Sequence, residues 1–150
     1  MCGITGVIGK TNKGESLIKD MTTVITYRGP DDAGYFVDGP IMLGMRRLSI
    51  IDLGGGHQPI HNEDGTLTIV FNGEIYNYQE LQYTLKQKGH VFKTDSDTEV
   101  LIHLYEEYGT KMLNLLRGMY AFAIYDKTNK EVFIARDYFG IKPLYYLVDK

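Results

Sequence analysis

Cys2-Gly3-Ile4-Thr5-Gly6-Val7-Ile8-Gly9 begins the chain directly after Met1. The stretch is short, rich in β-branched residues and bounded by glycines, a pattern that predicts a buried first strand. Apolar residues then recur with the spacing of one face of a helix, at Leu17, Ile18, Met21, Val24 and Ile25. The chain therefore opens with a strand followed by an amphipathic helix.

Cys2 is the only cysteine of the chain. If Met1 is removed, this one residue has a thiol on its side chain and a primary amine on its backbone. Because an α-amino group titrates at about 7.7 to 8.0, a useful fraction of it is unprotonated at neutral pH and can accept the thiol proton. An N-terminal residue activated by its own amine is a known catalytic nucleophile. The alternative is that Cys2 is a small apolar residue at the start of a buried strand.

Strands and helices are predicted along the whole remaining chain. Residues 27–32 form a loop, because Gly29 and Pro30 end the first helix. Asn72-Gly73 is predicted to end the strand at 66–71, since the pair favours positive φ. Helices are expected around Tyr78, Leu81 and Leu85 up to Gly89, and over 98–108 up to Gly109. Further strands are predicted at 35–37, 41–45, 48–51, 120–125, 132–135 and 144–148.

Length and composition exclude several classes of protein. The chain has 150 residues, 43% of them hydrophobic and 23% charged, which suits one globular domain. Its net charge of −3 offers no basic face for nucleic acid. One cysteine excludes an internal disulfide, and neither a signal peptide nor a long apolar run is present, so we expect a cytoplasmic protein without membrane contact. The four histidines match no metal-ligand motif, so we expect surface or packing roles for them and no metal site.

Polar residues cluster where predicted strands end. A substrate with a zwitterionic amino-acid head needs an arginine for its carboxylate and an aspartate for its ammonium, which Arg47 and Asp97 could supply. Asn72 and the backbone N–H of Gly73 could together stabilise an oxyanion. Each residue also has a simpler interpretation: Asn-Gly as a turn, Asp97 as a helix cap and Arg47 as a surface residue of a strand. Their occurrence together with Cys2 favours acyl-transfer chemistry.

Seven segments of the chain, in the same order, resemble the glutaminase domain of glutamine-hydrolysing asparagine synthetases. They lie at 1–4, 28–31, 47–52, 71–77, 96–99, 118–126 and 136–146. The resemblance implies an α+β fold, the N-terminal-nucleophile (Ntn) hydrolase sandwich with αββα layers and two antiparallel sheets. It also implies a class II glutamine amidotransferase, in which a cysteine thiolate attacks the carboxamide of L-glutamine, a γ-glutamyl thioester forms and ammonia leaves.

The resemblance also assigns roles to residues. Cys2 is expected to be the nucleophile with its own amine as base, and Asn72 and Gly73 to hold the oxyanion. Arg47 is expected to bind the substrate carboxylate and Asp97 its α-amino group. Residues expected to line the glutamine pocket are Leu48, Ser49, Ile50, Ile51 and Glu74.

The family continues beyond this domain. The resemblance implies a few further strands, so that residues 1–150 are an incomplete glutaminase domain, and then a synthetase domain that uses ATP and Mg to adenylate aspartate. We expect no cofactor in the glutaminase domain itself, and expect ammonia to pass to the aspartyl-adenylate of the absent domain. Full-length family members are commonly homodimers, a state that this sequence leaves open.

Two alternatives remain at this point. One is a paralogous amidotransferase that gives ammonia to a different acceptor, such as a sugar phosphate. The other is a truncated, non-catalytic module that binds glutamine or a protein partner, because an incomplete sheet exposes an edge and apolar surface.

Overall fold

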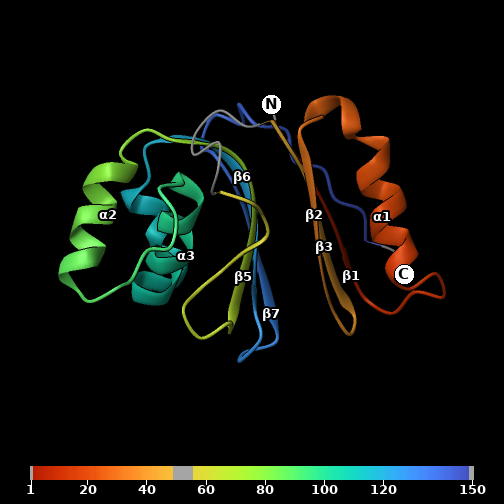
Figure 1. The fold of residues 1–150 in the computed structure, drawn as a ribbon, viewed down its shortest axis with the longest axis horizontal. Coiled ribbons are helices and arrows are strands. Elements are labelled where there is room, and N and C mark those ends of the chain that lie inside the picture. Colours follow the sequence, from red (N-terminus) through yellow and green to blue (C-terminus); the bar gives the residue numbers. More distant parts are fainter. Residues whose placement is uncertain (1, 49–55, 149–150) are drawn as a thin grey trace.

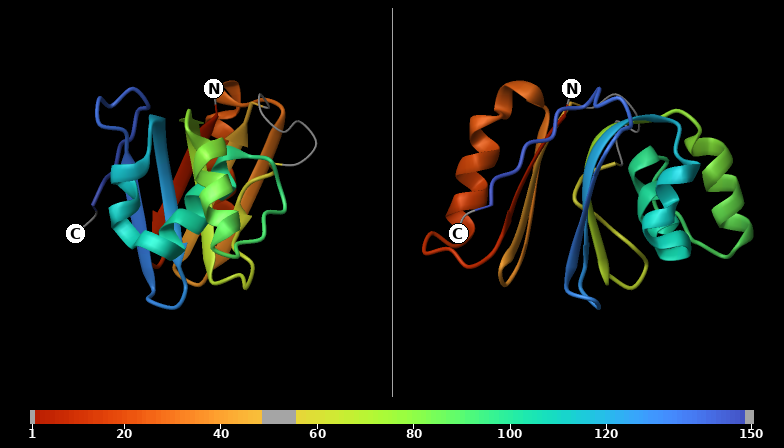
Figure 2. Two further views of the ribbon diagram at one scale, coloured as in Figure 1. Left: turned by 90° about the vertical axis from the view of Figure 1, so that its left-hand side faces the viewer. Right: turned by 180° about the vertical axis from the view of Figure 1, so that it is seen from behind.

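Two antiparallel sheets pack face to face, and helices cover both outer faces (Figure 1). The computed structural model describes residues 2–48 and 56–148. Sheet A has the strand order β1-β3-β2 and sheet B the order β4-β5-β6-β7. Helix α1 covers sheet A, while α2 and α3 cover sheet B (Figure 2). This is the predicted αββα sandwich of the α+β class.

The helices and strands of the described residues have the following bounds. They are β1 (Gly3–Ile8), α1 (Glu15–Val24), η1 (Thr26–Arg28), β2 (Asp32–Asp38), β3 (Ile41–Arg47), β4 (Ile60–His61), β5 (Leu67–Ile75), α2 (Tyr78–Gln87), α3 (Asp97–Tyr108), η2 (Gly109–Leu115), β6 (Gly118–Asp126) and β7 (Glu131–Arg136). None of the helices in this part of the chain is both long and apolar enough to cross a membrane.

Strand β5 is buried on both faces, because sheet A covers one and the helices cover the other. Val70 packs between the sheets, with Leu43 and Met45 of β3. Its neighbours Ile69 and Phe71 point to the opposite face and join the core under α3. Successive side chains of a strand alternate between its faces, so β5 connects the two cores of the molecule.

The predicted helices and most strands are confirmed, but the end predicted for the strand at 66–71 is wrong. Strand β5 runs on through Asn72 and Gly73 to Ile75, with Gly73 opposite Tyr120 of β6. A Cβ at Gly73 would overlap the carbonyl oxygen of Met119, so this position needs glycine for close backbone approach. Long-range pairing with β6 has overridden the local turn preference of the pair.

The strand predicted at 144–148 is not formed. These residues have no regular structure and extend from the sheet B side toward the sheet A and α1 side of the molecule (Figure 2). Tyr145 and Leu147 are each 92% exposed. A strand needs a neighbour for its backbone N–H and C=O groups, and none of the described strands pairs with this segment. The strand predicted at 48–51 falls mostly outside the described residues, and Leu48 follows the end of β3.

Candidate functional site

A cavity of about 320 Å³ opens where strands of both sheets and the first turn of α3 meet. This volume lies at the small end of the range for ligand pockets. Both sheets contribute to its wall. The lining residues are Cys2, Arg47, Leu48, Gly56, Gln58, Phe71, Asn72, Gly73, Glu74, Ser96, Asp97, Thr98, Met119, Ile141 and Lys142.

Cys2 lies at the edge of this cavity, directly before β1. The backbone N–H of Leu48 donates to Cys2 Sγ at 3.4 Å, and the thiol faces the Leu48 carbonyl oxygen at 3.6 Å. Arg28 Nε donates to the Cys2 carbonyl oxygen at 3.1 Å. Because Gly3 pairs with Arg46 across β1 and β3, the antiparallel register places Cys2 beside the end of β3, where Arg47 lies.

Arg47 is the last residue of β3 and is only 7% exposed. Its carbonyl oxygen accepts a hydrogen bond from the Asp31 N–H at 3.0 Å, which joins the loop after η1 to the rim of the site. Its guanidinium gives the cavity one permanent positive charge, suited to a carboxylate. Leu48 and Glu74 line the same cavity as predicted, while Ser49, Ile50 and Ile51 lie outside the described residues.

The N–H of Gly73 points toward the side of β5 that faces the cavity. Successive N–H groups of a strand point to opposite edges, so those of Phe71, Gly73 and Ile75 share one edge. Phe71 N–H donates to Gln58 Oε1 at 2.7 Å and Ile75 N–H donates to Asp97 Oδ2 at 2.9 Å, which identifies this edge. The Gly73 N–H lies between these two bonds.

The opposite strand confirms this direction. The backbone N–H and C=O of Tyr120, the residue paired with Gly73, bond to Asp137 on the far side of β6 at 3.2 and 2.8 Å. Gly73 and Tyr120 are therefore not bonded to each other through the ladder. With the buried side chain of Asn72 next to it, the Gly73 N–H can donate to a ligand in the cavity.

Asp97 is a buried carboxylate at the first residue of α3, 5% exposed. Burial raises its pKa to about 6, and the nearby Glu74 charge adds to the rise, while the hydrogen bond from Ile75 N–H opposes it. Within residues 2–48 and 56–148 no lysine or arginine forms an ion pair with it. The helix cap is instead Ser96, whose side chain accepts from Thr98 N–H, so the alternative role of Asp97 as cap is wrong. An ammonium group in the cavity would stabilise this charge.

Four polar residues of the cavity wall were missed by sequence reasoning, namely Gln58, Ser96, Thr98 and Lys142. The buried amide of Gln58 accepts from Phe71 N–H and donates to Thr98 Oγ1 at 3.2 Å, which ties β5 to α3 behind the cavity. Lys142 is buried, and its N–H donates to Asp137 Oδ2 at 2.9 Å. Lys142 lies in a segment that resembles the family, but no spacing rule pointed to a place in the cavity.

The structure therefore brings together all the predicted site residues that it describes. A thiol, an arginine, a buried carboxylate and a pair of donors face one small cavity. Such a set can hold a small zwitterionic molecule by its head and present an acyl group to the thiol.

Comparison with known proteins shows the family of the chain. A family model described as a glutamine amidotransferase domain matches residues 1–150. The chain is 52% identical over 151 residues to asparagine synthetase [glutamine-hydrolyzing] 1 of Bacillus subtilis, and 43% identical over 148 residues to an asparagine synthetase of Zea mays. These alignments cover 97% of this chain but 24% and 25% of the relatives, so the chain spans about a quarter of their length.

A solved structure shows the fold at greater evolutionary distance. The glutamine phosphoribosylpyrophosphate amidotransferase of B. subtilis superposes with a TM-score of 0.78 at 24% identity, over 95% of this chain and 38% of that one. The Ntn-hydrolase fold predicted from the motifs is therefore confirmed. This chain belongs to the glutamine amidotransferase domain family.

Proposed function

We propose that this chain hydrolyses L-glutamine to glutamate and ammonia, as the amidotransferase part of an asparagine synthetase. The observation that supports this most is the shared cavity of Cys2, Arg47 and Asp97. A thiol alone would suit many reactions. The arginine and the buried aspartate restrict the substrate to one with both a carboxylate and an ammonium group.

In the proposed reaction the glutamine head is held first. Arg47 binds the α-carboxylate and Asp97, in its ionised form, binds the α-ammonium. Holding both charges fixes the direction of the side chain, so that the carboxamide carbon reaches Cys2 Sγ. The cavity volume of about 320 Å³ suits a small substrate of this kind.

Cys2 then acts as the nucleophile. After removal of Met1, the α-amine of Cys2 takes the thiol proton, and the thiolate attacks the carboxamide carbon. Negative charge develops on the carboxamide oxygen, where the Asn72 side-chain amide and the Gly73 N–H would donate. The tetrahedral intermediate collapses as the amine returns its proton to the leaving nitrogen, giving ammonia and a γ-glutamyl thioester. Water then attacks the thioester, releasing glutamate and the free thiol.

The acceptor of the ammonia is proposed from the relatives. Those quoted above are named glutamine-hydrolysing asparagine synthetases, and they are about four times as long as this chain. We infer a separate synthetase part that uses ATP and Mg to form an aspartyl-adenylate and takes up the ammonia. The half-reaction described here needs no cofactor. Its single cysteine and ordinary composition support a cytoplasmic place of action.

The proposal is tested by glutamine turnover in matched variants. Cys2→Ala should abolish glutamate release. Arg47→Gln should leave the thiol reactive toward a small general alkylating agent but raise the KM for glutamine, since it removes the partner of the substrate carboxylate. Glutamine binding without glutamate release by the Met1-free chain would favour the non-catalytic alternative. Release that is unaffected in Cys2→Ala would refute the proposal.

A further inference from the structure

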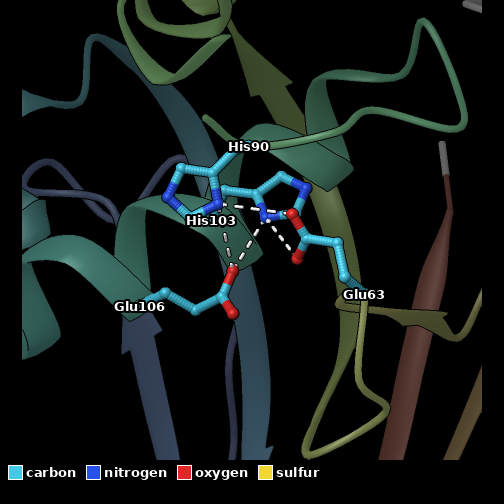
Figure 3. A group of neighbouring side chains, drawn as sticks. All are labelled: Glu63, His90, His103 and Glu106. Carbon is cyan, nitrogen blue, oxygen red and sulfur yellow. Dashed lines mark hydrogen bonds and ion pairs between the residues drawn. The ribbon is translucent and has the colours of Figure 1, made fainter. Parts of the chain in front are cut away.

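Two histidines and two glutamates converge on the helical side of sheet B (Figure 3). Glu63 comes from the turn after β4 and His90 from the link between α2 and α3. His103 and Glu106 are three residues apart on α3, so they share one face of that helix. None of the four lines the Cys2 cavity. They form a second cluster, which we call the His–Glu cluster.

The donor atoms of the cluster lie close enough to share one ion. His103 Nδ1 is 2.8 Å from Glu106 Oε2 and 3.4 Å from Glu63 Oε2. His90 Nδ1 is 3.5 Å from Glu63 Oε1 and 3.6 Å from Glu106 Oε2. One donor atom from each residue can be chosen so that all four lie within 4.8 Å of one another.

These separations are comparable with the edges of a tetrahedral metal site. Zinc binds histidine nitrogen and carboxylate oxygen at about 2.0 to 2.2 Å, so neighbouring ligands of a tetrahedron are about 3.3 to 3.6 Å apart. The four distances, which involve both oxygens of Glu63, run from 2.8 to 3.6 Å, and a set with one donor atom from each residue lies within 4.8 Å. Imidazole with carboxylate is also a donor set that zinc and related divalent ions accept.

Each of the four side chains has a further contact outside the cluster. For the histidines these are Glu107 Oε1, 3.2 Å from His90 Nε2, and Glu99 Oε1, 3.7 Å from His103 Nε2. Asn62 Nδ2 donates to Glu106 Oε1 at 2.8 Å, which turns Glu106 Oε2 inward. Val91 N–H donates to Glu63 Oε1 at 3.1 Å. Outer partners of this kind orient ligands in metal sites.

His103 has the arrangement expected of a metal-bound histidine. It is 1% exposed, and its Nδ1 faces the cluster while its Nε2 faces Glu99 Oε1 at 3.7 Å. Nε2 forms no hydrogen bond with the described residues. Glu99 is itself fixed by the N–H groups of Lys93 and Thr94 at 2.8 and 2.7 Å. A carboxylate behind a ligating imidazole is a recurrent feature of zinc sites.

We propose that Glu63, His90, His103 and Glu106 bind one divalent transition-metal ion, with zinc the best match to the donor set. The ion clamps the turn after β4 and the link between α2 and α3 onto α3. Its role is structural, because the cluster lies nearly two turns along α3 from Asp97 and shares no residue with the cavity. The inference is independent of the glutaminase reaction and replaces the expectation of a chain without a metal site.

A proton competes with the metal for His103. Burial by itself lowers the pKa of this imidazole, but hydrogen bonding to Glu106, with Glu99 and Glu63 beside it, outweighs burial and raises the pKa to about 9. Metal binding at neutral pH therefore releases protons, and the affinity rises with pH.

The test is a zinc titration of the chelator-treated chain, followed by calorimetry and by the thermal midpoint. A Cys2→Ala background removes the thiol as a competing ligand. We expect one zinc per chain and a higher Tm. Loss of a residue that only hydrogen-bonds to a metal ligand lowers the metal affinity roughly 10- to 100-fold. Glu63→Gln and His90→Asn each remove a ligand, so each should lower the zinc affinity by more than that. Cobalt bound in place of zinc should show the intense visible absorption of a four-coordinate ion, and lose it in Glu63→Gln.

Glu107→Gln is the matched control. Glu107 Oε1 touches His90 Nε2 at 3.2 Å, so this variant removes a carboxylate from the same surface without removing a ligand. Glutamine keeps the Oε1 acceptor for His90 Nε2, so this variant should weaken zinc binding by no more than the roughly 10- to 100-fold that an outer partner contributes. Glu63 is 35% exposed at its side chain, and retained circular dichroism would show that its variant folds. The proposal is overturned if the Cys2→Ala chain binds no zinc, or if Glu63→Gln, His90→Asn and Glu107→Gln all bind it equally.

Discussion

At the scale of single residues, the cavity contains buried polar groups that, in the proposed function, bind the ligand. Asp97 is buried without a cationic partner in the described part of the chain, and its pKa is raised to about 6 as a result. Arg47, the last residue of β3, is also buried. The buried charge of Asp97 lowers the stability of the free protein, and in the proposed function the ammonium group of the ligand offsets this cost.

Asp97→Asn should therefore stabilise the free protein at neutral pH. The pKa of Asp97 in the folded protein, about 6, lies above its ordinary value of 3.8, so the folded protein binds this proton more tightly than the unfolded chain does. The parent protein therefore loses free energy of unfolding as the pH rises from about 4 to 6. Above pH 6 the variant should be more stable by up to about 3 kcal/mol, with the advantage vanishing near pH 4. Denaturant unfolding of both proteins from pH 4 to 7 measures this.

The same substitution should raise the KM for glutamine, because only the ionised carboxylate pairs with the α-ammonium. In the parent protein the KM should rise as pH falls below about 6. For the unfolding experiment, a difference in free energy of unfolding between the parent and Asp97→Asn that stays constant from pH 4 to 7 would contradict the raised pKa of Asp97.

At the scale of elements, the helices were predictable and the strand ends were not. The apolar spacing and the glycines after α2 and α3 predicted both helices, because helical periodicity is local. Asn72-Gly73 was misread, since its turn preference is also local but pairing with β6 decides the backbone. The segment 144–148 has the composition of a strand, yet pairing depends on a neighbour that composition does not reveal.

Gly73→Ala should test the contact between β5 and β6. A Cβ at this position would overlap the Met119 carbonyl oxygen and come within 2.8 Å of Tyr120 Cα, so the strands would have to move apart. We expect a loss of about 1 to 3 kcal/mol in the free energy of unfolding. The same shift would displace the Gly73 N–H and lower glutamine turnover.

Gly6→Ala is the control for that change. Gly6 also lies in a strand, but its Cβ would meet Leu43 Cδ2 only at 3.4 Å, an ordinary contact. We expect little change in unfolding free energy or turnover. Equal effects of the two alanines would show that close approach of β5 and β6 is not what requires Gly73.

At the scale of the whole molecule, the cavity exists because the two sheets meet. Cys2 directly precedes β1 of sheet A and Arg47 ends β3 of the same sheet, while Asn72 and Gly73 belong to sheet B and Asp97 to α3. The chemistry was predictable because each residue lies in a motif of the family. Gln58 and the His–Glu cluster were not, because tertiary packing of distant segments creates them.

The packing of one sheet on the other should dominate stability. Leu43 is 1% exposed in the core between the sheets, so Leu43→Ala should cost about 2 to 5 kcal/mol by leaving a cavity. Leu147→Ala, at 92% exposure, should change the free energy of unfolding by less than about 0.5 kcal/mol. Chemical denaturation compares the two, and a large loss in Leu147→Ala would mean that residues 144–148 pack against the protein.

The central claim, that the thiol of Cys2 is activated by its own amine to open the amide of glutamine, is tested most directly by intact mass. The chain is treated with an electrophilic glutamine analogue, and fractions with and without Met1 are compared. We predict one covalent adduct at Cys2 in the Met1-free fraction, prevented by excess L-glutamine, and none in the fraction that retains Met1. Equal labelling of both fractions, or glutamine turnover by protein that retains Met1, would contradict the account.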